Sequence, residues 1–283
     1  MTFRTYLFVP ADSPRKMERA LQSGADALIL DLEDSVAADR KDAARAEVAR
    51  FLDAPAPMAR FVRVNALCTG LTEADVASTA AARPDGYVLP KCEGPDDIET
   101  LSGLVDQAGG AASVRIMAIA TESVRAVRRL MRENWSHPRL SALTWGGEDL
   151  SADMGASRNR DAGGAYLGPF QLARNLTLLA ALEAGVEAID AVYTDFANAE
   201  GLRDETAEAR DLGFTGKLAI HPAQVAPIHD VFRPDPGQVE WARRVIAALA
   251  AAGGGVARLD GEMLDRPHLL QAQRILARCN PSL

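Results

Sequence analysis

The sequence predicts an α/β fold, specifically a (β/α)8 TIM barrel with a C-terminal helical extension. Eight short apolar runs alternate with segments of helical spacing over the first 222 residues. Most of these runs are nearly continuous rather than alternating, which is typical of strands buried on both faces. The length of 283 residues suits one such barrel with an appendage. A doubly wound open sheet is the alternative, and the lack of a G-x-G-x-x-G motif after an early strand weighs against it.

The predicted strands follow one another along the chain with helical segments between most of them. They span residues 6–10, 27–34, 60–65, 86–91, 113–122, 140–149, 188–195 and 217–222. A long Gly-rich polar segment, 151–171, follows the sixth strand, a position where active-site lids occur. Beyond the eighth strand, a Gly-rich connection joins helical patterns around 236–252 and 266–279. We therefore expect a catalytic barrel over 1–225 and a helical extension over 226–283.

Composition excludes several classes of function. The formal net charge of −8 argues against binding to a nucleic-acid backbone. The three cysteines form no C-x-x-C motif, so neither a disulfide framework nor a thiolate zinc site is expected. No run reaches the ~18 apolar residues of a membrane span, and no signal-peptide pattern opens the chain. The expectation is a cytoplasmic protein without membrane or nucleic-acid partners.

Charged residues gather where the predicted strands end. They are Glu33, Asp34, Arg63, Lys91, Glu122 and Asp149. In a TIM barrel the chemistry lies at the C-terminal ends of the strands. A buried charge costs several kcal/mol unless it is paired, so these residues have either a functional role or ion-pair partners. A structural pair such as Glu33 with Lys91 is the alternative for any one of them.

Glu122 and Asp149 are the predicted metal ligands. They are carboxylates on neighbouring predicted strands, a donor set that suits Mg2+, with Mn2+ able to replace it. Zinc is disfavoured because the four histidines show no metal-binding spacing. Arg63 is the candidate for a substrate carboxylate, since a guanidinium can bind it with two parallel hydrogen bonds.

Other catalytic designs have weaker support. No G-x-S-x-G motif is present, and no cysteine lies in a nucleophile context. Lys91 could form a Schiff base, but its acidic neighbours favour the metal route. His221 follows a buried strand, and a hydrogen-bonded structural role is favoured over that of a general base.

The motifs themselves resemble those of the HpcH/HpaI aldolase and citrate lyase family. They are LFVPADSPRKMERAL, ALILDLEDSV, RVN, LPK, IATES, GGEDLSADMG, DLGFTGKLAIHPAQ and DGEMLDRP. The resemblance covers residues 4 to 279. The similarity is greatest to the branch that contains the citrate lyase β subunit and the malyl-CoA and citramalyl-CoA lyases. It implies a Mg2+-dependent lyase that acts on the C2–C3 bond of a β-hydroxyacyl-CoA, giving acetyl-CoA and a keto acid.

The resemblance also implies roles for individual residues. Glu122 and Asp149 would ligate Mg2+, Arg63 would bind the acyl carboxylate, and Asp34 with Glu33 would support the water shell of the metal. Coenzyme A would contact Phe8, Arg15 and Arg19, and the ligand would also meet Leu218 and Ala219. The acid/base group would be Asp265.

Asp265 lies about 40 residues beyond the last predicted strand, in a tail that has left the barrel. We therefore expect it to act in the active site of a neighbouring subunit, within a homo-oligomer, trimer or hexamer, that the resemblance implies. The alternative is that Asp265 only caps the helix that follows it. Three other functions stay open: a citrate lyase β subunit acting on a carrier-bound thioester, a malyl-CoA thioesterase, and a non-catalytic subunit.

Overall fold

The fold is a closed barrel of eight parallel strands with a separate tail, in a computed structural model that describes residues 3–253 and 255–279. The barrel strands are β1 (Thr5–Pro10), β2 (Ala27–Asp31), β3 (Ala59–Arg63), β4 (Gly86–Leu89), β5 (Arg115–Ile119), β6 (Leu140–Thr144), β7 (Glu187–Asp190) and β8 (Gly216–Ala219). Each strand pairs with the next one, and β8 pairs with β1. The predicted TIM barrel is confirmed.

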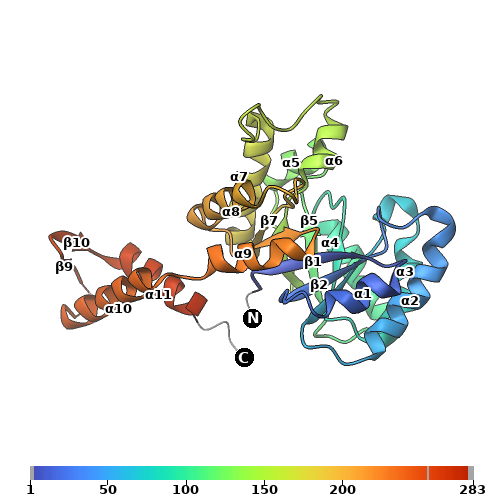
Figure 1. Cartoon of the computed structure of the whole chain (residues 1–283), viewed down its shortest axis with the longest axis horizontal. Helices are drawn as coiled ribbons and strands as arrows, with labels where there is room; N and C mark the ends of the chain where they lie inside the picture. The colour runs from blue at the N-terminus through green and yellow to red at the C-terminus, as the bar shows by residue number, and fades with distance from the viewer. Residues whose placement is uncertain (1–2, 254, 280–283) are drawn as a thin grey trace.

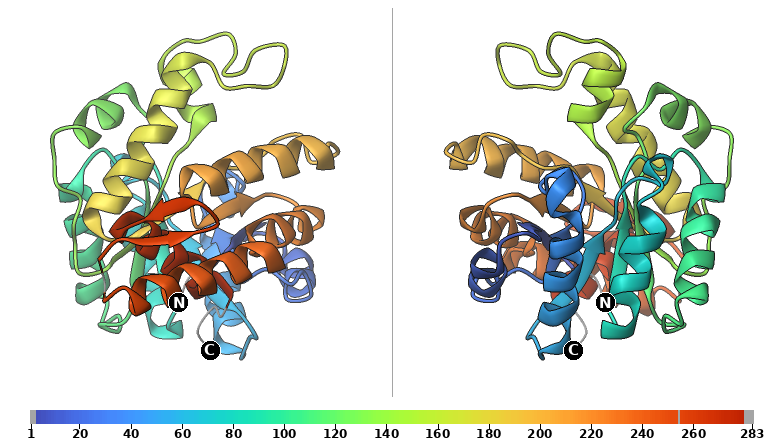
Figure 2. Two further views of the ribbon diagram at one scale, coloured as in Figure 1. Left: turned by 90° about the vertical axis from the view of Figure 1, so that its left-hand side faces the viewer. Right: turned by 90° about the vertical axis from the view of Figure 1, so that its right-hand side faces the viewer.

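Helices cover the outside of the barrel, as Figure 1 shows. They are α1 (Pro14–Ala20), α2 (Lys41–Asp53), α3 (Thr72–Thr79), α4 (Pro95–Gln107), α5 (Val124–Leu130), α6 (Gly147–Asp153), α7 (Gly168–Ala184), α8 (Ala199–Leu212) and α9 (Val225–Phe232). The loop between α6 and α7 projects from the top of the molecule (Figure 2). None of the helices in the described part of the chain combines the length and apolar character that crossing a bilayer requires.

Two apolar cores follow from the alternation of side chains along each strand. One fills the barrel, with Ile29, Phe61 and Ile189 among its members. The larger one lies between the sheet and the helices, where Leu28 and Ala188 point. The face to which a strand residue belongs is therefore set by its position in this alternation.

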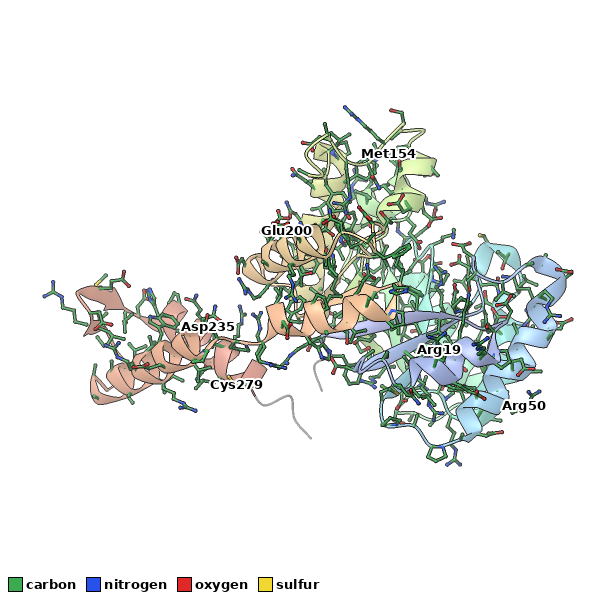
Figure 3. All side chains as sticks on the ribbon, in the orientation of Figure 1. Arg19, Arg50, Met154, Glu200, Asp235 and Cys279 are labelled. Atoms are coloured by element: carbon green, nitrogen blue, oxygen red, sulfur yellow. The ribbon has the colours of Figure 1, made fainter. Side chains whose placement is uncertain are left out.

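The tail consists of α10 (Pro236–Ala251), the hairpin β9 (Ala257–Leu259) and β10 (Glu262–Leu264), and α11 (Arg266–Cys279). It projects from the side of the barrel (Figure 1) and has an apolar core of its own. Asp235, where α10 begins, and Cys279, where α11 ends, both lie at the junction with the barrel (Figure 3). The helix α9, by contrast, packs against β1 and β8.

Candidate active site

A cavity of about 320 Å³ opens at the C-terminal ends of the barrel strands. Five of the residues predicted from the sequence line it, namely Phe8, Arg63, Glu122, Asp149 and Leu218. The strands end earlier than the sequence indicated. Glu33 and Asp34 follow β2, Lys91 follows β4, and Glu122 follows β5. The placement of Asp149 at a strand end is wrong, because Asp149 lies in the first turn of α6, five residues after β6.

Arg63 is bound to a residue that sequence reasoning missed, Asp31. The two residues are opposite each other in the β2–β3 register. The Nε and Nη2 atoms of Arg63 donate to the two carboxylate oxygens of Asp31, each over 2.7 Å. Burial alone would raise the pKa of Asp31, but the hydrogen bonds and charge of Arg63 hold it below its ordinary value. The bidentate face of the guanidinium is thus occupied, so a substrate contact must use its remaining N–H groups.

Three further carboxylates surround Arg63 and Lys91. Arg63 Nη1 lies 2.9 Å from Glu33 Oε2, and Lys91 Nζ lies 2.6 Å from Glu33 Oε1. The predicted structural pair of Glu33 with Lys91 is therefore present. Lys91 Nζ is also 3.3 Å from Asp149 and 3.6 Å from Asp34. Burial acts to lower the pKa of Lys91, but the hydrogen bond to Glu33 and the charge of Glu122 raise it. Lys91 remains an ammonium and is a poor amine nucleophile.

Glu122 is buried beside the backbone of the β4 and β6 loops. One of its oxygens accepts a hydrogen bond from the Lys91 backbone N–H. A Cβ at Gly146 would lie 2.6 Å from Glu122 Cγ, so only glycine fits there. The close approach of Glu122 therefore explains the glycine at position 146. Burial raises the pKa of Glu122 well above its ordinary value, and repulsion from Asp149 raises it further.

The mouth of the barrel carries more negative than positive charge. The carboxyl groups there are Asp31, Glu33, Asp34, Glu122 and Asp149, and they outnumber the two cations, Arg63 and Lys91. Within the described residues, no group of three or more His, Cys, Asp or Glu side chains is placed to hold a metal. Glu122 and Asp149 form a two-carboxylate site, and the excess charge favours a cation between them and a substrate.

The remaining predicted residues lie away from the cavity. Arg15 and Arg19 are exposed on α1, and Arg19 lies on the far side of the barrel from the tail (Figure 3). Ala219 is buried and points into the helix-covered core. Asp265 is in the tail, where its carboxylate lies 2.6 Å from His268 Nδ1. The structure thus brings the predicted metal ligands, Glu122 and Asp149, and Arg63 together at one cavity of a single chain. Asp265 of the same chain does not line this cavity.

His221 has a local structural contact, in line with the favoured interpretation. Its Nδ1 accepts a hydrogen bond from the Ala223 N–H, and its ring stacks on Phe196 with centroids 5.3 Å apart. It is exposed rather than buried.

One wall of the cavity is formed by Trp145 and Tyr166. Both rings line the cavity, in an edge-to-face contact with centroids 4.7 Å apart. Tyr166 comes from the long loop after α6, and no local pattern in that loop distinguishes it from its polar neighbours.

The chain is similar to known proteins over nearly its whole length. Residues 4–222 match the family model described as HpcH/HpaI aldolase/citrate lyase. A (3S)-malyl-CoA thioesterase from Cereibacter sphaeroides is 37% identical over 98% of this chain and 94% of its own length. The mitochondrial citramalyl-CoA lyase of Rattus norvegicus is 32% identical over 96% of this chain and 85% of its own length.

A solved structure is similar over the whole chain. The protein CitE from Mycobacterium tuberculosis, in complex with magnesium, acetoacetate and coenzyme A, superimposes with a TM-score of 0.83. The two sequences are 33% identical, and the match covers 98% of each chain.

Proposed function

Because the chain belongs to the HpcH/HpaI aldolase/citrate lyase family, we propose that it is a Mg2+-dependent lyase of β-hydroxyacyl-CoA esters. As a member of this family it is a lyase enzyme. The reaction would break or form the C2–C3 bond of an ester such as malyl-CoA or citramalyl-CoA, with acetyl-CoA and a keto acid as products. The observation that carries the proposal is that Glu122, Asp149 and Arg63 line one cavity.

Glu122 and Asp149 fit the metal that the proposal requires. They are oxygen donors in a mouth where carboxyl groups outnumber cations, and the pKa of Glu122 is raised by burial and by Asp149. A hard divalent cation that keeps part of its water shell suits such a site. When bound, Mg2+ supplies Lewis-acid polarisation of the keto-acid oxygens. Glu33 and Asp34, on the same side of the mouth, would hold its water ligands.

The residues of the chain would then bind the substrate and move one proton. In the cleavage direction the Asp265 carboxylate would take the proton of the substrate hydroxyl, the C2–C3 bond would break, and its electron pair would pass to the acetyl thioester as an enolate. Asp265 would protonate the enolate carbon. Arg63 would bind the carboxylate of the keto acid through the N–H groups that Asp31 leaves free.

Coenzyme A would be held near β1 and α1. Phe8 lines the cavity, and its ring lies 4.9 Å below the Arg63 guanidinium carbon. Arg15 and Arg19, four positions apart on α1, have no ion-pair partner in the described part of the chain. Two exposed guanidinium groups on one helix face suit the phosphates of the nucleotide. Leu218 lines the cavity beside Phe8, and Ala219 would act through its backbone.

Asp265 would serve a neighbouring subunit of a homo-oligomer. Its support is that the tail projects away from its own barrel and carries Asp265 outside the cavity lining (Figure 1). Asp265 also directly precedes α11, and its backbone N–H donates to Nδ1 of His268 three residues later, which is the geometry of one half of a capping box. Capping and catalysis are compatible for this residue.

Complementation between two inactive variants tests this arrangement. Co-expressed Asp265→Ala and Glu122→Gln chains would form some interfaces that join an intact tail to an intact metal site. Activity should return to a fraction of that of the unmodified protein. Mixed oligomers that stay inactive would show that the tail serves its own barrel. Full activity of Asp265→Ala alone would show that Asp265 is only a helix cap.

Product analysis tests the reaction itself. The protein is incubated with malyl-CoA, citramalyl-CoA or citryl-CoA, with Mg2+ or with EDTA, and products are identified by mass spectrometry. We expect acetyl-CoA with one keto acid, only when metal is present, and none from Glu122→Gln. Lack of turnover of every ester would overturn the proposal.

Hydrolysis is the second candidate, because the relative that is 37% identical is named a thioesterase. In that case the same assay would yield free coenzyme A and an intact hydroxy acid. A citrate lyase β role would instead show as turnover only of a carrier-bound thioester.

A further inference from the structure

Trp145 and Tyr166 form one wall of the cavity. A charged side chain that does not itself line the cavity, Arg160, holds this wall. This residue is in the loop between α6 and α7 and is one of a bridged pair with Tyr166. Its Nη2 hydrogen-bonds the Tyr166 hydroxyl, and its guanidinium carbon lies 3.7 Å from the centre of the Tyr166 ring. Since Tyr166 lines the cavity and Arg160 does not, Arg160 affects a substrate through the residues that it holds rather than by contact.

Arg160 also ties the loop to α8. Its Nη1 lies 2.5 Å from Glu205 Oε2 and donates to the Gly164 carbonyl over 2.8 Å. The side chains of Arg160 and Glu205 are 20% and 8% exposed, so this pair is shielded from water far more than a surface ion pair. The contact therefore fixes a loop that otherwise projects from the barrel (Figure 2).

The same network reaches the second wall residue, Trp145. Lys217 Nζ, fully buried, bridges Glu205 over 2.9 Å and Asp190 over 2.7 Å. Asp190 accepts a hydrogen bond of 2.8 Å from the indole N–H of Trp145. Both aromatic rings of the wall are thus held by one connected set of buried charges.

We propose that Arg160 is a positioning residue that fixes the Trp145–Tyr166 wall and so limits the size of the acyl group that the cavity accepts. This inference rests on the proposed function. A keto acid with a hydrogen substituent differs from one with a methyl group by one carbon atom. An apolar wall can discriminate one such group by about 10- to 200-fold, provided that the wall does not yield.

Removing Arg160 should therefore relax discrimination against the larger ester. In Arg160→Ala, Tyr166 loses its hydrogen bond and its stacked cation, and the loop loses its anchor on Glu205. We expect the ratio of kcat/KM for citramalyl-CoA to that for malyl-CoA to rise about fivefold or more. Arg160→Lys keeps a charge for Glu205 but not the fork, so it should restore part of the original ratio.

The experiment compares four proteins: the unmodified chain, Arg160→Ala, Arg160→Lys and the control Arg158→Ala. Arg158 is an exposed arginine of the same loop. Both kcat/KM values are measured, together with hydrogen–deuterium exchange of residues 154–167. Exchange there should be faster in Arg160→Ala and unchanged in Arg158→Ala. Tyr166→Phe, which keeps the ring and removes only the hydroxyl, should move the ratio in the same direction by less.

An unchanged ratio in Arg160→Ala, or an equal fall of both kcat/KM values, would overturn a role in specificity. Unchanged exchange would overturn the anchoring of the loop. If the unmodified protein cleaves neither ester, the proposed function fails, and the exchange measurement alone decides whether Arg160 fixes the wall.

Discussion

Two ion pairs of the barrel have the same construction and opposite surroundings. Asp31 and Arg63 face each other across β2 and β3, and Asp190 and Lys217 face each other across β7 and β8. We call them the mouth pair and the outer pair. The mouth pair lies on the side of Ile29 and Phe61, inside the barrel, whereas the outer pair lies on the side of Ala188 and faces the helices.

This difference in face decides what each pair can do. The outer pair belongs to a balanced set in which three cations (Arg160, Arg174, Lys217) meet three carboxylates (Asp190, Glu205, Glu208). The mouth pair belongs to a set beside a cavity in which carboxyl groups outnumber cations. A balanced set acts by holding other residues in place, while an unbalanced set on a cavity can bind a cation.

The largest effect is expected from breaking the outer pair. Lys217→Met leaves two buried carboxylates without their shared ammonium, which should lower the free energy of unfolding by about 3–5 kcal/mol. Guanidinium denaturation measures this loss. The control Lys16→Met, on the exposed face of α1, should change it by no more than about 0.5 kcal/mol. A loss of less than about 1 kcal/mol in Lys217→Met would contradict the structural role of the outer pair.

Neutralising the unmatched charges of the mouth should affect catalysis instead. Glu122→Gln and Asp149→Asn should each lower kcat at least about 100-fold, because each weakens binding of the Lewis acid. Steady-state assays at saturating substrate give kcat, and Glu73→Gln on the exposed surface of α3 is the matched control. Near-normal kcat in either variant would remove that carboxylate from the site.

Arg63→Lys tests whether Arg63 of the mouth pair binds the substrate as well as Asp31. The charge is kept, but the guanidinium can no longer bind Asp31 with two hydrogen bonds and still present an N–H to substrate. We expect kcat/KM to fall about 10- to 100-fold with little change in unfolding. If kcat/KM stays near that of the unmodified protein, Arg63 is only a structural partner of Asp31.

The smallest effects are expected on α1, outside both sets of charges. Arg15→Ala and Arg19→Ala should each raise KM for the CoA ester by up to about fivefold and leave kcat unchanged, since exposed ion pairs contribute about 1 kcal/mol or less. An unchanged KM in the double variant would place the nucleotide elsewhere.

The eight strands were predictable because buried parallel strands are continuous apolar runs. The ends of the strands were harder to predict, because the apolar run continues into the loop. The predicted end of the second strand therefore fell at Glu33 and Asp34, although β2 ends at Asp31. The hairpin of the tail was missed although its Asp260–Gly261 turn is a known signal, since its strands have only three residues each.

The place of Glu122 and Arg63 at the mouth could be predicted because each follows or ends a strand, and the barrel brings strand ends together, whereas Asp149 reaches the mouth from the first turn of α6. Arg160 and Glu205 could not, because they are 45 residues apart and come from a loop and a helix. Contacts of this kind depend on how the outer elements pack, which no local pattern specifies.

Direct measurement of metal binding tests the central claim, that Glu122 and Asp149 at the mouth of the barrel form a binding site for a divalent cation. Mn2+ is titrated into the metal-free protein, and bound ion is counted by electron paramagnetic resonance. We predict one Mn2+ per chain, displaced by Mg2+, with binding lost in Glu122→Gln and Asp149→Asn and kept in Glu73→Gln. Equal binding by the unmodified protein and both mouth variants would contradict the account.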